Sequence, residues 1–427
     1  MTTFLSASSR APGAERLGKF GAAAAGALLC CLPGFAVTPP LEMVALNRPV
    51  DAAGAAMPRW AWGPSIVELA DGQLLVAYTA SAKTAGSATI EKSDFTALYF
   101  TQRNAAGGEW TPPRRAPFDR PEVGEGNPLL FLHGEELWLF YFGVPRAPNG
   151  TWPGGEQSAE LYWRRSADQG ATWSEATLLR APVTVSATKP VRLANGDIVL
   201  PFSSSPSGVL ITSDSGKTWR ESLFPATGRE AAASMPSVQP LPDGRLLAML
   251  RTSRVNHDPA RQLLHRSLSA DGGRTWSVPE PLPAIRNPNS RLDLVQLPSG
   301  ELLVVGNDTV RLPQRDGASG RKEINLLLTA DLGRTVSHRK TVAKRYDQTV
   351  AKPNGVIEWG YPSAILGRDG RTIHFVFGSR NDKRQEQLGQ IYYCRVDRPW
   401  FERPATLAEF DPDEALAPRN LPRTAAP

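Results

Sequence analysis

One pattern recurs six times along the chain: an apolar run, a tight turn that contains glycine, and a second apolar run. The segment 64–78, PSIVELADGQLLVAY, shows it in full. Asp-Gly between β-prone runs is a strong hairpin signal, because both central residues of such a turn favour positive φ. The turn glycines are Gly72, Gly134, Gly196, Gly244, Gly300 and Gly370. A unit that repeats at roughly 40 to 60 residues predicts a propeller or a solenoid.

A second motif, Ser-x-Asp-x-Gly-x-Thr-Trp, lies between these hairpins and is called the Asp box below. Three copies end in Trp173, Trp219 and Trp276, a fourth ends in Val336, and the segment 104–110 is a degenerate copy. The aspartate can accept backbone N–H bonds, the glycine permits the chain reversal, and the tryptophan can pack against a blade. We therefore expect the four box aspartates to build turns and to have no catalytic role. They are Asp168, Asp214, Asp271 and Asp331.

These two motifs predict an all-β fold, a six-bladed β-propeller of four-stranded antiparallel blades with Asp boxes. Each blade is expected to place the Asp-Gly hairpin near the axis and the box on an outer hairpin. The 37 glycines and 38 prolines among 427 residues suit many short elements joined by turns. We expect the propeller over residues 58–403, with 390–396 closing the sixth blade, and a Pro/Ala-rich C-terminal tail over 404–427.

Residues 1–36 have the pattern of a secretory signal peptide. Three basic residues precede the apolar stretch 20–32, and small residues stand at positions 34 and 36. The pattern predicts an exported protein, periplasmic or secreted. An uncleaved N-terminal membrane anchor is the alternative, although the apolar run is short for a membrane span. Removal of the segment would leave Cys394 as the remaining cysteine, without an intramolecular disulfide partner.

The charge pattern favours a small anionic ligand over nucleic acid. The chain has 48 basic and 42 acidic residues, a net charge of +6, and the basic residues are scattered singly. The five histidines lack metal-ligand spacing, and the chain has neither a phosphate-binding glycine loop nor a Cys/His cluster. We therefore expect no metal, no other cofactor and no membrane span in the mature chain. The oligomeric state stays open.

Over residues 58–400, the three full Asp boxes and six hairpins resemble the sialidase (neuraminidase) superfamily, in particular its bacterial Asp-box (BNR-repeat) members. The resemblance implies an exo-glycosidase that removes an acidic, sialic-acid-type terminal sugar from glycans or glycoconjugates. In this family three arginines bind the substrate carboxylate, a tyrosine partnered by a glutamate is the nucleophile, and an aspartate is the acid/base.

Several positions match that pattern. Tyr361, in the segment 360–363, is similar to the nucleophile, and Asp94, just before the run 97–101, lies near the acid/base position. Arg251 and Arg321 resemble the second and third arginines. Their forked guanidinium groups suit a carboxylate because they can bind both of its oxygens.

Three further residues are expected at the same mouth of the axial channel, where the innermost strands begin and the second strands return. Asn127 and Lys189 each precede a proline in an innermost strand, and Arg380 ends a returning strand. Each is a candidate for substrate binding.

Two positions differ from the family pattern. Trp62 stands where the first carboxylate-binding arginine is expected, and Met235 stands where the glutamate is expected. Glu230 and Glu358 are nearby carboxylates that could replace it. Two alternatives therefore remain open: a non-catalytic glycan-binding propeller, and a carbohydrate-active enzyme of other linkage specificity.

Overall fold

The structure is a computed structural model, and it describes twelve stretches of the chain. They are residues 42–47, 50–58, 60–81, 96–118, 123–145, 159–186, 188–226, 232–253, 258–310, 320–344, 358–383 and 386–403. All of them belong to the unit Thr38–Pro427. The predicted signal peptide or anchor and the predicted C-terminal tail, 404–427, lie outside the described residues.

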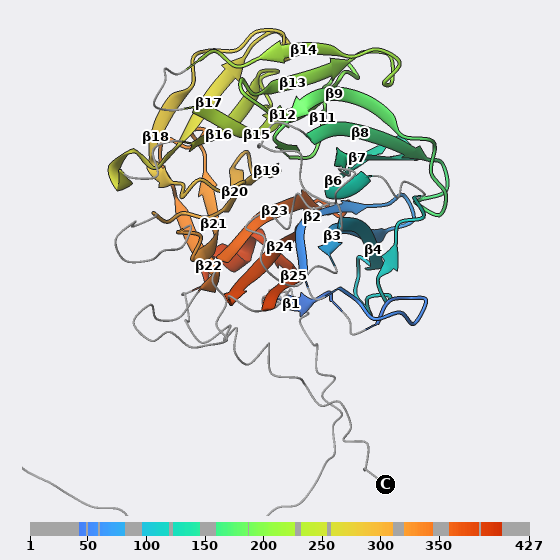
Figure 1. Ribbon diagram of the computed structural model, residues 1–427. Coiled ribbons are helices and arrows are strands. Elements are labelled where there is room, and N and C mark those ends of the chain that lie inside the picture. Colours follow the sequence, from blue (N-terminus) through green and yellow to red (C-terminus); the bar gives the residue numbers. More distant parts are fainter. Residues whose placement is uncertain are drawn as a thin grey trace, which may run out of the picture. The chain divides into compact units, whose positions relative to one another are not determined.

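Six antiparallel sheets form a ring, which confirms the predicted β-propeller (Figure 1). Blade 1 is β2 (Trp60–Glu68), β3 (Gln73–Ser81), β4 (Thr96–Asn104) and β5 (Arg114–Arg115). Blade 2 is β6 (Val123–His133), β7 (Glu136–Pro145), β8 (Ala159–Ser166) and β9 (Thr177–Val183). Blade 3 is β10 (Val185–Ser186), β11 (Val191–Arg192), β12 (Ile198–Ser203), β13 (Gly208–Thr212) and β14 (Arg220–Leu223).

The second half of the ring repeats this order. Blade 4 is β15 (Ala232–Pro240), β16 (Leu246–Ser253), β17 (Leu263–Ser269) and β18 (Glu280–Arg286). Blade 5 is β19 (Asp293–Gln296), β20 (Leu302–Gly306), β21 (Glu323–Thr329) and β22 (His338–Lys344). Blade 6 is β23 (Glu358–Leu366), β24 (Thr372–Lys383), β25 (Glu386–Asp397) and β1 (Glu42–Ala45).

The first strand of each blade lines the axis, and these inner strands contact one another around it. For example, β2 contacts both β6 and β23. All six turn glycines predicted from the sequence have positive φ, between 65° and 90°. The hairpins that follow the inner strands are therefore those that the Asp-Gly pattern predicts.

The sixth blade is closed by the N-terminal strand β1. The segment 390–396, expected to close it, lies within β25, the third strand of this blade, and β1 pairs with the outer edge of β25. Glu42 pairs with Arg395 and Ala45 with Tyr392. The propeller therefore includes residues before position 58.

The core consists of six apolar clusters, one between each pair of neighbouring blades. The cluster between blades 1 and 2 joins Phe100 to Tyr141, and that between blades 3 and 4 joins Ile211 to Leu246. Each sheet is therefore buried on both faces, which explains the continuous apolar runs of its middle strands. Burial of these faces against their neighbours stabilises the ring.

Each Asp box packs against the preceding blade. Trp173, from the box of blade 2, stacks on Phe100 of blade 1 at 5.7 Å between ring centroids. Trp276, from blade 4, packs on Phe224, which follows the last strand of blade 3, with 4.7 Å between the ring centroids. In the degenerate copy, Trp110 of blade 1 packs edge-on against Tyr393 of blade 6. The boxes therefore fix contacts between blades as well as turns.

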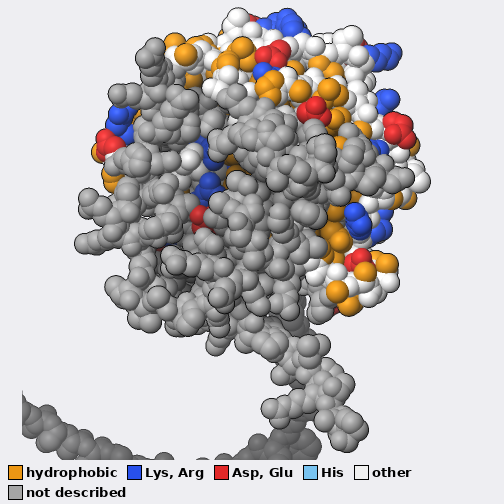
Figure 2. Space-filling view, in the orientation of Figure 1, with side chains coloured by type: hydrophobic (Ala, Val, Ile, Leu, Met, Phe, Trp, Pro, Cys, Tyr) orange, Lys and Arg blue, Asp and Glu red, His pale blue; other side chains and the backbone are white. Residues whose placement is uncertain are grey.

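Two short 3₁₀ helices occur among the described residues, η2 (Pro259–Arg261) and η3 (Arg398–Glu402). In the same stretches of chain, no helix has the length and hydropathy needed to cross a membrane. Described acidic and basic side chains are interspersed on the face shown in Figure 2, as their scatter along the sequence predicts.

Candidate active site

Four inner strands carry the same β-bulge near the point where they begin. Their registers shift between Trp62 and Ser65 in β2, Gly126 and Leu129 in β6, Ser234 and Ser237 in β15, and Gly360 and Ser363 in β23. In each bulge one residue with positive φ precedes a proline. A bulge turns a side chain away from the regular pleat. These strands therefore present a specific residue at corresponding points around the axis.

Hydrogen bonds between neighbouring inner strands show that the strands are aligned in the same way from blade to blade. The Leu130 backbone N–H donates to Ser65 Oγ at 2.9 Å, and the Ala364 N–H donates to Asp293 Oδ2 at 2.8 Å. In both cases the acceptor lies in the preceding blade: Ser65 stands two residues after Gly63 of the β2 bulge, and Asp293 stands two residues after Arg291. The residues at these points are Gly63, Asn127, Met235 and Tyr361 in the four bulges, and Arg291 in blade 5.

Tyr361 has a backbone conformation that a bulky residue rarely adopts. Its φ is +56°, and only 4% of the residue is exposed. For an aromatic side chain such a φ is a genuine outlier, and such outliers cluster at functional sites. The Trp62 ring packs against Tyr361 at 5.1 Å between centroids, and Met235 belongs to the same apolar cluster.

The two arginines assigned to the carboxylate converge beside Tyr361. Arg251 Nη1 and Arg321 Nη2 each donate to the backbone oxygen of Asn289, both at 2.9 Å. The guanidinium carbon of Arg321 lies 5.4 Å from the centroid of the Tyr361 ring. The structure therefore brings together three of the residues that the sequence analysis assigns to this site, from blades 4, 5 and 6.

Glu358 is the acidic member of this group. It lies on β23, three residues before Tyr361, and its side chain is 3% exposed. Its Oε2 lies 3.7 Å from Arg321 Nη1, so the carboxylate offsets part of the positive charge there. Of the two carboxylates that could replace one at position 235, Glu358 lies in this group, and Glu230 lies outside the described residues.

Arg291 is a site residue to which the sequence analysis gave no role. It is 1% exposed, and its guanidinium carbon lies 5.0 Å from the centroid of the Tyr361 ring. Its Nη2 donates to the carbonyl oxygens of Pro64 and Tyr361, each at 3.1 Å. A signal was available, because Arg291 stands two residues before Asp293 just as Tyr361 stands two before Ser363.

The remaining predicted site residues are described one by one. Asp94 lies outside the described residues. The backbone of Arg380 pairs with that of Glu358 across β23 and β24. Asn127 is buried next to Gly63, where an added Cβ would lie 2.0 Å from Asn127 Oδ1, so only glycine fits there.

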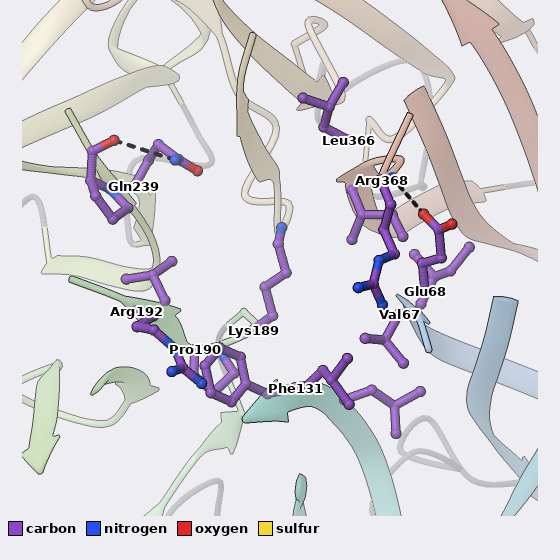
Figure 3. Close-up of a pocket in the computed structure, with 15 residues that line it drawn as sticks. Val67, Glu68, Phe131, Lys189, Pro190, Arg192, Gln239, Leu366 and Arg368 are labelled. Carbon is purple, nitrogen blue, oxygen red and sulfur yellow. Dashed lines mark hydrogen bonds between the residues drawn. The ribbon is translucent and has the colours of Figure 1, made fainter. Parts of the chain in front are cut away.

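Lys189 lines a cavity of about 350 Å³ at the other end of the axial channel (Figure 3). This cavity is bounded by residues near the ends of β2, β6, β15 and β23, among them Phe131 and Leu366, and by Arg368, which follows β23. Lys189 Nζ donates to Asp293 Oδ2 at 2.5 Å and to the Leu294 carbonyl oxygen at 3.4 Å. These contacts place the ammonium group beside blade 5.

Comparisons with known proteins agree with this architecture. A Dyadobacter fermentans protein of unknown function is 18% identical, with a TM-score of 0.62 over 84% of this chain and 100% of that one. A Hadza microbial sialidase is 17% identical, with a TM-score of 0.61 over 81% and 67% of the two chains. The intramolecular trans-sialidase from Ruminococcus gnavus is 16% identical, with a TM-score of 0.62 over 85% and 99%. At these identities the likeness establishes the fold.

The sequence itself gives the family. No curated protein matches it. Residues 65–375, which include blades 2 to 5 and most of the inner hairpins of blades 1 and 6, match the BNR repeat-like domain. This match covers well over half of the chain, and the chain therefore belongs to the family of BNR repeat-like domains.

Proposed function

We propose that this protein is a sialidase-like exo-glycosidase that removes an acidic terminal sugar from glycans. The observation that carries the proposal is the convergence of Arg251 and Arg321 on one backbone oxygen beside Tyr361. Two guanidinium groups that can donate to one oxygen atom can also donate to the oxygens of one carboxylate. The sialidase-like folds of the compared structures support the same substrate class.

In this proposal Tyr361 is the nucleophile and Asp94 is the acid/base. The phenolate oxygen of Tyr361 forms a bond to the anomeric carbon while the glycosidic bond breaks, and the leaving oxygen takes a proton from Asp94. Water then releases the sugar from the tyrosine, with Asp94 accepting a proton. Arg251 and Arg321 hold the sugar carboxylate, and Arg380 is a third candidate for that role.

We expect the purified protein to release the fluorophore from an α-sialoside reporter. Tyr361→Phe should reduce kcat/KM by about 10³-fold or more, because the nucleophile is lost. Arg251→Ala and Arg321→Ala should each reduce it by about 10- to 150-fold. That range corresponds to one charge-assisted hydrogen bond of about 1.5–3 kcal/mol. Steady-state kinetics at pH 4 to 8 measures these losses.

Arg334→Ala is the matched control, since Arg334 is exposed on the turn of the fourth Asp box. It should leave kcat/KM unchanged. A folded wild-type protein that releases no fluorophore across this pH range would contradict the proposal.

One observation favours a second candidate, a propeller that binds glycans without cleaving them. Trp62 is fully buried and packs on Tyr361, and Met235 places an apolar side chain in the same cluster. For this candidate we expect a sialylated oligosaccharide to bind without release of sialic acid, and Arg251→Ala to weaken that binding about tenfold or more. An enzyme of other linkage specificity would instead hydrolyse a different acidic glycoside.

A further inference from the structure

The cavity that Lys189 lines lies away from Tyr361, at the opposite end of the inner strands. Tyr361 stands near the start of β23, whereas Leu366, the last residue of that strand, borders the cavity. The five steps of extended chain from one residue to the other span roughly 16 Å. We call this space the axial cavity. Its volume of about 350 Å³ falls within the range of about 300–1,000 Å³ that small-molecule sites occupy.

The described residues that line the axial cavity come from five blades. They are 66–68 of blade 1, 130–132 of blade 2, 189–192 of blade 3, 239–240 of blade 4, and 365–366 with Arg368 of blade 6. Tyr361, Arg251 and Arg321 are not among them. The axial cavity is therefore separate from the site proposed for hydrolysis.

Most of the wall of the axial cavity is apolar. Val67 and Leu130 are buried, whereas Phe131, Leu132 and Leu366 each keep part of their surface exposed. Exposed apolar surface gathered in a concave place is typical of ligand-binding sites. An apolar ligand would cover this surface, and its removal from water would favour binding.

The charged side chains of the axial cavity are mainly basic. Lys189, Arg192 and Arg368 line it, and Glu68 is the acidic residue among the described lining residues. Lys189 is paired with Asp293 at 2.5 Å, and Glu68 Oε2 accepts the Arg368 backbone N–H at 2.7 Å. Three positive and two negative charges leave an excess of one positive charge. That excess suits a ligand with a single negative charge.

Two of these basic side chains keep donors for a ligand. Arg192 Nη2 donates to His133 Nδ1 at 2.8 Å, and Arg368 Nη1 donates to the Leu69 carbonyl oxygen at 3.1 Å. Burial and then the charge of Arg192 lower the pKa of His133 from 6.5, so the imidazole can accept this bond at pH 7.5. Each guanidinium has five N–H donors, so these contacts orient the group and leave further donors. In the view of Figure 3, Arg192 and Arg368 lie on either side of Lys189.

We propose that the axial cavity is a second binding site, which takes a small organic anion with an apolar body and one carboxylate or sulfonate group. The apolar wall covers the body of the ligand. Arg192 and Arg368 attract the acidic group and donate hydrogen bonds to it. The proposal does not depend on hydrolysis at Tyr361, and its test needs no glycan.

The test uses two fluorescent probes with the same aromatic rings. One is 8-anilinonaphthalene-1-sulfonate, called the sulfonate probe, and the other is N-phenyl-1-naphthylamine, the neutral probe. We expect the folded full chain at pH 7.5 to bind the sulfonate probe at one saturable site. The double variant Arg192→Ala/Arg368→Ala should raise the Kd of the sulfonate probe about tenfold or more. It should change the Kd of the neutral probe by less than about twofold, because only the charged contacts are lost.

Three further variants place the probe. Leu366→Ser should raise the Kd of both probes, because it removes apolar wall. Arg251→Ala, at the Tyr361 end of the inner strands, should leave both values unchanged. Arg334→Ala is the matched control for the loss of an exposed arginine, and it should also change neither value. Since Arg192 and Arg368 are exposed, their variants should keep the wild-type thermal unfolding midpoint.

Three results would overturn the inference. The first is a folded wild-type protein that shows no saturable binding of the sulfonate probe. The second is an equal Kd for that probe in the wild type and in the folded double variant. The third is loss of binding in Arg251→Ala alone, which would place the probe beside Tyr361.

Discussion

The aspartates of the four Asp boxes make the same hydrogen bonds in different sequences. Asp168 accepts from Ser166 Oγ at 2.8 Å, from the Thr172 N–H at 2.8 Å and from Thr172 Oγ1 at 2.6 Å. In the second box the first position is Thr212, whose hydroxyl replaces the serine hydroxyl and donates to Asp214 at 2.8 Å. The motif therefore requires a hydroxyl at this position and not serine itself.

These bonds give the boxes a predictable pH dependence. Hydrogen bonds from the side chain and backbone of Thr172 lower the pKa of Asp168 from 3.8 to about 2. Because the folded-state pKa is lower than the unfolded-state value, the carboxylate stabilises the fold above about pH 4. The stabilisation is lost as the pH falls from there toward 2.

We expect Asp168→Asn to lower the free energy of unfolding at pH 7, because the asparagine cannot accept the charge-assisted bond from Thr172 Oγ1. The difference from the wild type should shrink as the pH falls from 4 to 3. Urea denaturation at several pH values measures it. A difference that stays constant over this range would show that the charge of Asp168 does not matter.

Single residues also show how far the sequence could predict the site. Tyr361, Arg251 and Arg321 were assigned from their resemblance to the sialidase pattern, and the structure brings them together. Neither the role of Asn289 as a shared acceptor nor the burial of Arg291 could be predicted. The role of Asn289 depends on its backbone carbonyl group, which every residue has, so the amino-acid sequence does not indicate it. The burial of Arg291 depends on contacts with blades 1 and 6.

Among the elements, β1 has the weakest sequence signal, yet it completes the sixth blade of the propeller. It is a strand of four residues, and no turn links it to the strand with which it pairs. The chain just after it is firmly held: Leu46 is fully buried, and its N–H donates to the Ile391 carbonyl oxygen at 2.8 Å. Hairpins are predictable because their two strands are adjacent in sequence, whereas this pairing joins distant ends of the chain.

We expect Leu46→Ala to lower the free energy of unfolding by about 2–5 kcal/mol, since it leaves a cavity beside the sixth blade. Val50→Ala is the control, because Val50 is 48% exposed and its truncation should have little effect. Urea denaturation of both variants provides the comparison. Similar losses in the two would contradict the closing role given to this segment.

At the scale of the whole molecule, one carboxylate connects four blades across the axis. Asp293 in blade 5 accepts from Lys189 near the inner strand of blade 3, from Ser237 Oγ in blade 4 and from the Ala364 N–H in blade 6. Its side chain is 3% exposed and that of Lys189 is 16% exposed. The pair therefore fixes the inner strands relative to one another at the centre of the ring.

We expect Asp293→Asn to destabilise the protein by about 3–5 kcal/mol, because it leaves the Lys189 ammonium without its carboxylate in a mostly buried place. The double variant with Lys189→Met should lose less than the sum of the two single losses, which denaturant titration of all four proteins would reveal. Additive losses would mean that the two side chains do not interact.

The pairing of β1 with β25 also determines the order in which the molecule can be completed. The ribosome makes β1 first and β25 after the other strands of the ring, so β1 must wait without its partner while nearly the whole propeller is synthesised. Contacts between such distant segments form slowly, and an unpaired edge strand is prone to pair with other chains meanwhile. This pairing thus joins the first strand of the propeller to be synthesised to the last, and the sixth blade can be completed only after β25 has been made.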